Sequence, residues 1–285
     1  LKRVGIRTVH YVSPSIWAWR AGRARTIGRS ADCVLCLFPM EPAIYARHGI
    51  DARFVGHPLA DRFPLVSDRD AARRELGIAP NAPVLAVLPG SRPSEIHRLG
   101  AIFLEAAQRV AAEIPHLQVV IPAANEACLR EIERLLKRPG PGTGPMLLDG
   151  HSHRAMVAAD VVLLASGTAA LEAMLAKRPM VAGYRISAFT HAVVKGLGML
   201  KTNVYSLPNV LAGKTLVPEL MQRDCTPEKL ADAVLQWFGD PARRDELRHD
   251  FERMHLALHA GGGSAMAAAR AIECVLIPDA EQPGR

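Results

Sequence analysis

Residues 84–96 read "VLAVLPGSRPSEI": an apolar run ends at Gly90, and Ser91, Arg92 and the predicted first turn of a helix follow. In a doubly wound sheet, ligands bind beyond the carboxyl ends of the strands. Gly90 lets the backbone approach a ligand closely because it has no Cβ. The helix directs N–H groups and its positive dipole end at the same space, and Arg92 can grip phosphate oxygens. The stretch predicts a phosphate-binding turn, with an ordinary surface turn as the alternative.

A second stretch, "LLASGTAALEAMLAKRPM" at 163–180, repeats the pattern. An apolar run ends at Ser166, Gly167 and Thr168, and a predicted helix carries Glu172 one turn further on, on the same face as Thr168. A glutamate there can accept hydrogen bonds from both hydroxyls of a ribose while the turn meets phosphate. The alternative is a capping turn with an exposed glutamate, but two such turns in one sheet favour a nucleotide site.

The fold class follows from how these stretches alternate. The apolar runs are mostly continuous, which is typical of strands covered on both sheet faces, and short helices separate them. The sequence therefore predicts an α/β fold with a parallel sheet. Strands are expected at 83–89, 117–123, 145–150, 160–166 and 179–184, and helices at 94–113, 125–137, 152–158 and 168–176.

The chain divides into segments of different character. Residues 1–57 give a shorter strand and helix set that starts as if in the middle of a domain, so we expect a remnant of an N-terminal Rossmann-like domain. A polar, proline-bearing stretch at 58–80 is predicted as a linker. Residues 81–225 form the predicted second Rossmann-like domain, residues 226–277 the closing helices, and residues 278–285 a tail.

Composition restricts the function classes. The chain has 285 residues, and 35 basic against 28 acidic residues give a net charge of +7, which attracts anions. Aromatic residues are only 5% and do not alternate with basic ones, so a nucleic-acid stacking surface is not expected. No apolar run is long enough to span a bilayer, which predicts a soluble chain. The five cysteines include Cys33 and Cys36, which form a C-x-x-C. The apolar "DCVLCLF" predicts them as buried thiols of a cytoplasmic protein, with a redox or zinc pair as the alternative.

Other candidate residues carry less weight. In "VYSLPNVLAGKTLVPELMQ" at 204–222, Asn209 is predicted to lie in a loop and Glu219 follows it. Asp68-Arg69-Asp70 could hold a metal but directly precedes a helix, where acids serve as caps. The remaining alternatives are a zinc pair or a helix start at His151 and His153, and a substrate contact or a half-buried helix at "SPSIWAWRAGR" (13–23). No metal is expected.

Five motifs occur in the order "HYVSPSIWAWR", "FVGHPLAD", "LPGSR", "LLASGTAALEAMLAKRPMVAGYR" and "SLPNVLAG", and together they cover essentially the whole chain. They resemble the lipid-A-disaccharide synthase family. The resemblance implies a GT-B fold and an inverting glycosyltransferase with no metal and no cofactor. It implies that UDP-2,3-diacylglucosamine and 2,3-diacylglucosamine 1-phosphate (lipid X) condense to lipid A disaccharide 1-phosphate and UDP.

The resemblance also implies roles for particular residues. Arg92 and Asn209 would be catalytic, and the UDP-sugar would contact Gly90, Ser91, Arg92, Ser166, Gly167, Thr168, Glu172, Asn209 and Glu219. The family's proposed general base belongs to an N-terminal stretch that has no counterpart here, so we expect the donor half of the site.

The expected setting is the cytoplasm, at the inner face of the inner membrane, on an anionic lipid surface, with a homodimer as one form. Three alternatives stay open: an inactive UDP-binding remnant, a peptidoglycan glycosyltransferase and a UDP-GlcNAc 2-epimerase. "SLPNVLAG" and "SPSIWAWR" argue against the last two.

Overall fold

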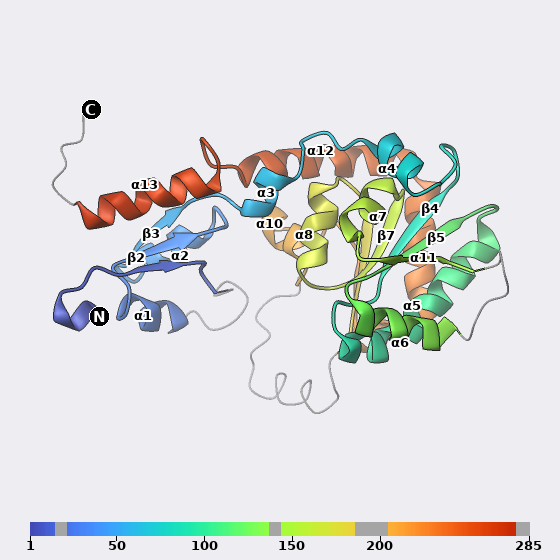
Figure 1. Cartoon of the computed structure of the whole chain (residues 1–285), viewed down its shortest axis with the longest axis horizontal. Coiled ribbons are helices and arrows are strands. Elements are labelled where there is room, and N and C mark those ends of the chain that lie inside the picture. Colours follow the sequence, from blue (N-terminus) through green and yellow to red (C-terminus); the bar gives the residue numbers. More distant parts are fainter. Residues whose placement is uncertain (15–21, 137–143, 186–204, 278–285) are drawn as a thin grey trace. The chain divides into compact units, whose positions relative to one another are not determined.

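The structure is a computed structural model that describes residues 1–14, 22–136, 144–185 and 205–277, and it forms two compact units (Figure 1). Unit 1 contains the described residues up to Pro64 and again those from Met254. Unit 2 contains those from Leu65 to Arg253.

Unit 2 is built on a parallel sheet of strand order β6-β5-β4-β7-β8-β9. Its central strands are the continuous apolar runs, and all five residues of β4 are buried, which confirms the expected two-sided coverage. Each predicted strand lies within about a residue of its expected bounds, whereas β9 was not predicted. The bounds are β4 (Val84–Leu88), β5 (Gln118–Ala123), β6 (Met146–Asp149), β7 (Val161–Ala165), β8 (Met180–Tyr184) and β9 (Glu219–Met221).

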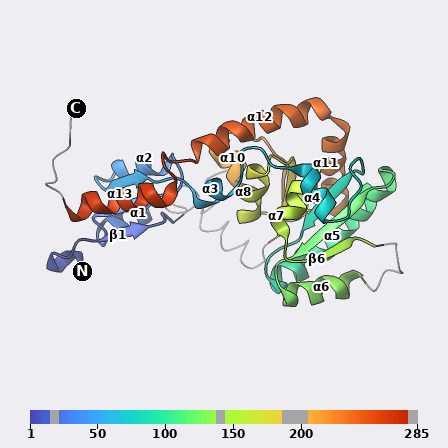
Figure 2. The same cartoon turned by 45° about the horizontal axis from the view of Figure 1, so that its top comes forward.

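Helices cover both faces of this sheet (Figures 1 and 2). One group packs together and on the central strands: α5 (Pro93–Glu113), α6 (Glu126–Leu136) and α11 (Pro227–Gly239). A second group contains α7 (Ser152–Ala158) and α8 (Thr168–Leu175), with α10 (Leu207–Ala212) against α8. Trp237 of α11 anchors the first group, since its buried indole N–H donates to the Met180 carbonyl at 3.1 Å. The central strands of the sheet thus form the core of unit 2, whereas the edge strands β6 and β9 are only partly buried.

Residues 58–80, predicted as a linker, contain two helices, α3 (Pro58–Arg62) and α4 (Arg69–Glu75). The side chain of Arg73, 1% exposed, donates to the Asp160 carboxylate at 3.0 Å and to three backbone carbonyls. The change from unit 1 to unit 2 falls inside this stretch, between Pro64 and Leu65. Asp68 accepts a hydrogen bond from the Ala71 N–H at 2.8 Å, so it acts as the cap of α4.

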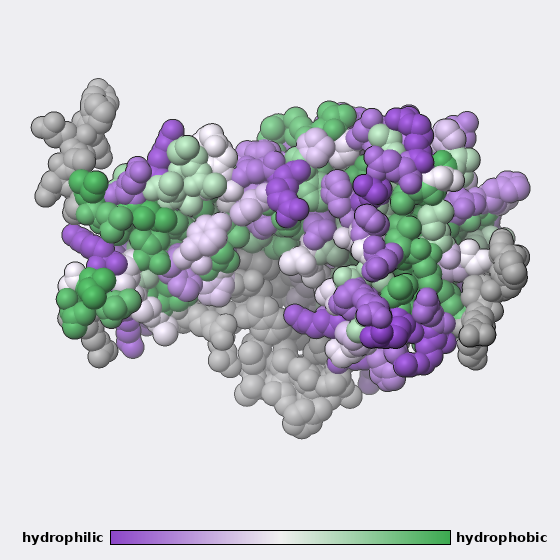
Figure 3. All heavy atoms as spheres, in the orientation of Figure 1, coloured by the Kyte–Doolittle hydropathy of each residue, from purple (hydrophilic) through white to green (hydrophobic). Residues whose placement is uncertain are grey.

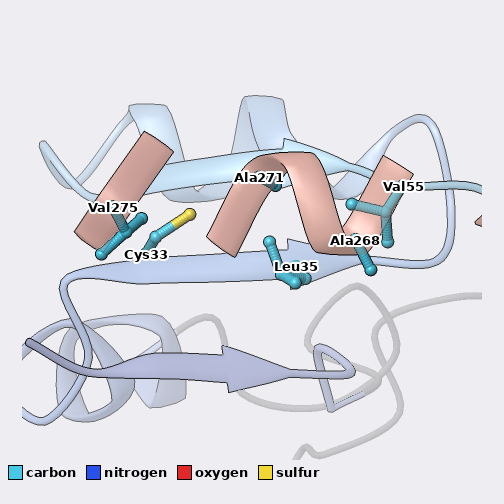
Figure 4. Packing of buried hydrophobic residues seen from close by; sticks show 6 residues of the cluster. All are labelled: Cys33, Leu35, Val55, Ala268, Ala271 and Val275. Atoms are coloured by element: carbon cyan, nitrogen blue, oxygen red, sulfur yellow. The ribbon is translucent and has the colours of Figure 1, made fainter. Parts of the chain in front are cut away.

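Unit 1 contains a smaller parallel sheet of order β1-β2-β3. Cys33 and Leu35 of β2 face α13, and Figure 4 shows this contact. Val34 and Cys36 point to the other face, because successive side chains of a strand alternate. The elements are a 3₁₀ turn η1 (Lys2–Val4), β1 (Val9–Tyr11), α1 (Gly22–Gly28), β2 (Cys33–Cys36), α2 (Glu41–Ala46), β3 (Asp51–Phe54) and α13 (Ser264–Leu276). The remaining elements of the described residues are a second 3₁₀ turn η2 (Gln222–Asp224) and α12 (Pro241–Ala257).

The predicted core role of the C-x-x-C cysteines is confirmed. Cys33 and Cys36 are both buried and lie on opposite faces of β2. Burial raises the pKa of the Cys33 thiol to about 11, and it raises the pKa of Cys36 as well. The pair therefore cannot close around one metal ion, and both side chains stay protonated at neutral pH.

Exposed apolar side chains occur in unit 1, and hydrophobic residues are visible at the left of Figure 3. They belong to the N-terminal segment, to the end of α12 and to α13 with its C-cap: Leu1, Val4, Ile6, Tyr11, Val12, Leu256, Met266, Ile272, Leu276 and Ile277. Among the described residues, no helix has both the length and the apolar character that crossing a membrane requires.

Candidate functional site

A cavity of about 390 Å³ opens in unit 2 beside the carboxyl ends of β4 and β7. The two strands pair in parallel with Leu88 opposite Leu164, so the turns that follow them meet at the same edge of the sheet. The volume is within the range of small-molecule sites. Its lining comprises Leu88, Gly90, Ser91, Arg92, Glu95, Pro122, Ala124, Ser152, Met156, Ala165, Ser166, Gly167, Thr168, Ala169, Glu172 and Tyr184.

The first turn of the cavity follows β4. Gly90 has a φ of 146°, a conformation that side-chain-bearing residues rarely adopt, and it turns the chain sharply into α5. Arg92 is the N-cap of α5, and Pro93 follows at the first helical position, where its missing N–H costs nothing. The Arg92 side chain is 78% exposed. The turn therefore presents a helix start and a guanidinium to the cavity, as the sequence predicted.

The second turn follows β7. The Ser166 N–H donates to the Gly183 carbonyl at 3.0 Å, which fixes the turn against β8. Helix α8 begins at Thr168 after its N-cap Gly167, whose carbonyl accepts the Ala170 N–H at 3.2 Å, and Glu172 lies one turn further on. The cavity thus brings together seven of the nine predicted donor-site residues: Gly90, Ser91, Arg92, Ser166, Gly167, Thr168 and Glu172.

Asn209 and Glu219 do not line this cavity. The prediction that Asn209 lies in a loop is wrong, because it belongs to α10 and is 0% exposed. Its amide donates to the Val217 carbonyl at 2.9 Å and to Glu219 Oε1 at 2.6 Å, and its oxygen accepts from the Leu216 and Val217 N–H groups. Both polar atoms of the side chain are already engaged within the protein.

Glu219 completes the same network from β9. Its carboxylate accepts hydrogen bonds from the Tyr205 N–H at 2.8 Å and from the Ser206 N–H and hydroxyl at 2.9 and 2.6 Å. The network ties α10 to β9, and α10 packs on α8, which carries Glu172. The observed role of the pair is to hold this segment, while a direct role at the donor stays a prediction.

Glu95 is the charged lining residue of the cavity that the sequence did not predict. Its Oε2 accepts the Ser91 N–H at 2.8 Å, and its Oε1 lies 3.6 Å from Arg92 Nη1. A signal was present in the sequence, because Glu95 stands three residues after the N-cap, where glutamate often turns back on the helix start.

The structure describes some of the weaker candidates and not others. His151 has a φ of 57° and is the N-cap of α7, so the helix-start interpretation holds for "DGHSHRAM". Trp17 and Trp19 fall within 15–21, outside the described residues.

Comparison with known proteins gives the family. The family model described as lipid-A-disaccharide synthetase matches residues 1–272. A lipid-A-disaccharide synthase of Xanthomonas campestris pv. campestris is 55% identical over 276 residues, which is 96% of this chain and 62% of that protein. The Xylella fastidiosa synthase is 54% identical over 269 residues, 94% of this chain and 70% of that protein.

Solved structures support the fold class. UDP-GlcNAc 2-epimerase from Neisseria meningitidis bound to UDP-GlcNAc matches with a TM-score of 0.56 at 14% identity, over 95% of this chain and 71% of that one. Anabaena HepE in complex with UDP-glucose matches with a TM-score of 0.51 at 13% identity, over 94% and 71%. At such identities the likeness concerns the fold alone, and with the parallel sheets it confirms the predicted α/β fold of GT-B type.

The chain spans about 62% of the length of the Xanthomonas campestris relative. The family model and both relatives each cover more than nine-tenths of this chain. The chain belongs to the lipid-A-disaccharide synthetase family.

Proposed function

We propose that the cavity of unit 2 binds a UDP-sugar and that the chain is the donor-binding part of a lipid-A-disaccharide synthase. The reaction would be an inverting transfer from UDP-2,3-diacylglucosamine to 2,3-diacylglucosamine 1-phosphate, giving lipid A disaccharide 1-phosphate and UDP. The observation that carries this proposal is the convergence of two strand-turn-helix junctions, with Arg92 and Glu172, on one cavity.

The chemistry of an inverting transfer fits these groups. An acceptor hydroxyl attacks the anomeric carbon, the bond from that carbon to the UDP oxygen breaks, and the bonding electrons leave with the diphosphate. The hydroxyl proton passes to a base that we do not assign to this chain. Arg92 and the N-terminus of α5 would stabilise the negative charge on the leaving group, a role that a metal plays in other enzymes.

The other cavity residues take parts that suit their positions. Gly167 and Thr168, at the start of α8, would meet the second phosphate, since a helix N-terminus favours an anion. Glu172 would accept hydrogen bonds from the ribose hydroxyls. Asn209 and Glu219 would support the donor site from α10, which packs against α8, and from β9, which pairs with β8.

The membrane setting is part of the proposal. Both proposed substrates carry acyl chains, and the net charge of +7 would draw the protein to an anionic surface. We infer peripheral binding at the cytoplasmic face of the inner membrane. Co-sedimentation with anionic vesicles should weaken as salt rises, because salt screens charges on a scale of about 8–10 Å; binding that high salt leaves unchanged would contradict an electrostatic cause.

Calorimetric titration with UDP tests the donor site. The wild-type chain should bind, and Arg92→Ala should weaken binding about tenfold or more, because a charge-assisted contact to phosphate is lost. Arg130→Ala is the charge-matched control: Arg130 lies on α6, is 62% exposed and does not line the cavity. A folded chain that does not bind UDP, or equal losses in the two variants, would overturn the proposal.

A further inference from the structure

The Glu95 carboxylate contacts the Ser91 N–H and lies beside the Arg92 guanidinium, the groups that would bind phosphate in the proposed function. One oxygen of its carboxylate accepts the Ser91 N–H at 2.8 Å, and the other lies 3.6 Å from the Arg92 guanidinium. The Glu95 side chain is 24% exposed, while that of Arg92 is 78% exposed. The carboxylate thus lies in the wall of the cavity and faces the turn.

Gly90 makes this approach possible. A Cβ built at Gly90 would lie 2.5 Å from the Cβ of Glu95 and 2.8 Å from its Oε2, distances that real atoms do not reach. The missing side chain leaves space directly above the turn, and in this structure Glu95 occupies it. A phosphate that approached the Gly90 backbone would need the same space.

A carboxylate and a phosphate cannot occupy this position together. Both are anions, so they repel each other, and both would accept the same Ser91 N–H. The donor diphosphate can therefore reach the turn only if the Glu95 carboxylate leaves it. Glu95 is on the first turn of α5, and rotation of its side chain would move the carboxylate away from the Ser91 N–H and from Arg92, while its Cβ and the backbone stay in place.

We propose that Glu95 is an anionic placeholder for the diphosphate and sets the affinity of the site for UDP. When no donor is bound, the Glu95 carboxylate neutralises Arg92 and caps the Ser91 N–H. Donor binding exchanges the carboxylate for phosphate. After transfer the carboxylate competes with the product UDP for the same groups and speeds its release. This inference rests on the proposed function, because it needs a nucleoside diphosphate at the turn.

The test is UDP affinity in the variant Glu95→Gln. Glutamine keeps an oxygen that can accept the Ser91 N–H but loses the charge, so UDP should bind about three- to tenfold more tightly than in the wild type. Inorganic pyrophosphate should show the same gain, and uridine, which carries no phosphate, should show none. Glu105→Gln is the control, because Glu105 lies on the same helix, is 53% exposed and pairs with Arg109 outside the cavity.

Each result decides between the placeholder and a plain helix cap. If Glu95 only supports the turn, Glu95→Gln leaves UDP affinity unchanged or lowers it while Arg92→Ala still weakens binding, and the inference alone fails. If the wild-type chain binds neither UDP nor pyrophosphate, the proposed function and the inference fail together. A gain in affinity that Glu105→Gln reproduces would reflect net charge and would also overturn the placeholder.

Discussion

The cavity and the Asn209–Glu219 network lie in the same unit, but they differ in whether their polar side chains are buried and hydrogen-bonded within the protein or exposed. Around Asn209, which is 0% exposed, both polar atoms of the side chain are engaged by the protein itself. At the cavity, Arg92 is 78% exposed and its close charged partner is Glu95, at 3.6 Å. Groups already satisfied in the fold hold structure, whereas groups left open to a cavity can exchange partners with a ligand.

The largest effect that tests this difference is expected for the stability of a variant at Asn209. Asn209→Ala should lower the free energy of unfolding by about 3 kcal/mol, because buried N–H and C=O groups lose their partners. Urea unfolding can be followed by the fluorescence of buried Trp237 in a Trp17→Phe, Trp19→Phe background.

Asn125→Ala is the matched control for that prediction. Asn125 is exposed and caps α6 through the Cys128 N–H at 3.0 Å, so its loss should cost about 1 kcal/mol. Similar costs at the two asparagines would show that the buried network does not hold the unit.

A buried carboxyl group that lacks one hydrogen-bond partner should make stability depend on pH, which is expected of neither the cavity nor the Asn209 network. Glu41 in unit 1 is 1% exposed; one oxygen accepts the Phe38 N–H at 3.1 Å, and the other has no hydrogen-bond partner among the described residues. Burial raises the pKa of Glu41 from 4.5 to about 7, against the opposing effect of the Phe38 hydrogen bond. The neutral form therefore stabilises unit 1 below pH 4.5, and this contribution is lost as the pH rises through about 7.

We expect the stability of unit 1 to fall by about 2 kcal/mol between pH 5 and pH 8 on account of Glu41. Hydrogen-exchange pulse labelling at a fixed pH, after equilibration in urea at each pH, measures this in peptides that cover 33–46. Glu41→Gln should remove the difference. If Glu41→Gln keeps the whole pH dependence of stability, other groups cause it.

A substitution at Glu172 tests the other half of the comparison, the binding of ligand by groups that line the cavity. Glu172→Gln should weaken UDP binding about fivefold, or about 1 kcal/mol, because a carboxylate is the better acceptor for the ribose hydroxyls. Binding of 2′,3′-dideoxy-UDP should be the same in the variant and the wild type. An equal loss of affinity for both nucleotides would show that Glu172 does not contact the ribose hydroxyls.

The smallest effect is expected for Arg92 in the absence of ligand. Arg92→Ala should change the free energy of unfolding by less than about 0.5 kcal/mol, because an exposed ion pair contributes little. The same urea experiment measures it. A loss as large as that at Asn209 would mean that Arg92 supports the fold, and its effect on UDP binding would then need another explanation.

Much of unit 2 could be predicted because its signals are local. The apolar runs of β4 and β7 are too long and too continuous to be surface segments, and the small residues after them mark the turns. The same runs placed Gly90, Arg92 and Thr168 at the strand ends. Asn209 was misplaced because its helix is only six residues long and offers no apolar periodicity to recognise.

The sequence by itself determined which segments become strands, where two phosphate-type turns stand and to which family the chain belongs, because these depend on residue order and spacing. The tertiary structure alone decided which predicted site residues share a cavity, since Leu88 and Leu164 become neighbours only when β4 pairs with β7. It also decided that Asn209 turns inward to Val217 and Glu219, and that the Glu95 carboxylate lies over Gly90. Those contacts depend on side-chain directions and on burial, which the order of residues does not specify.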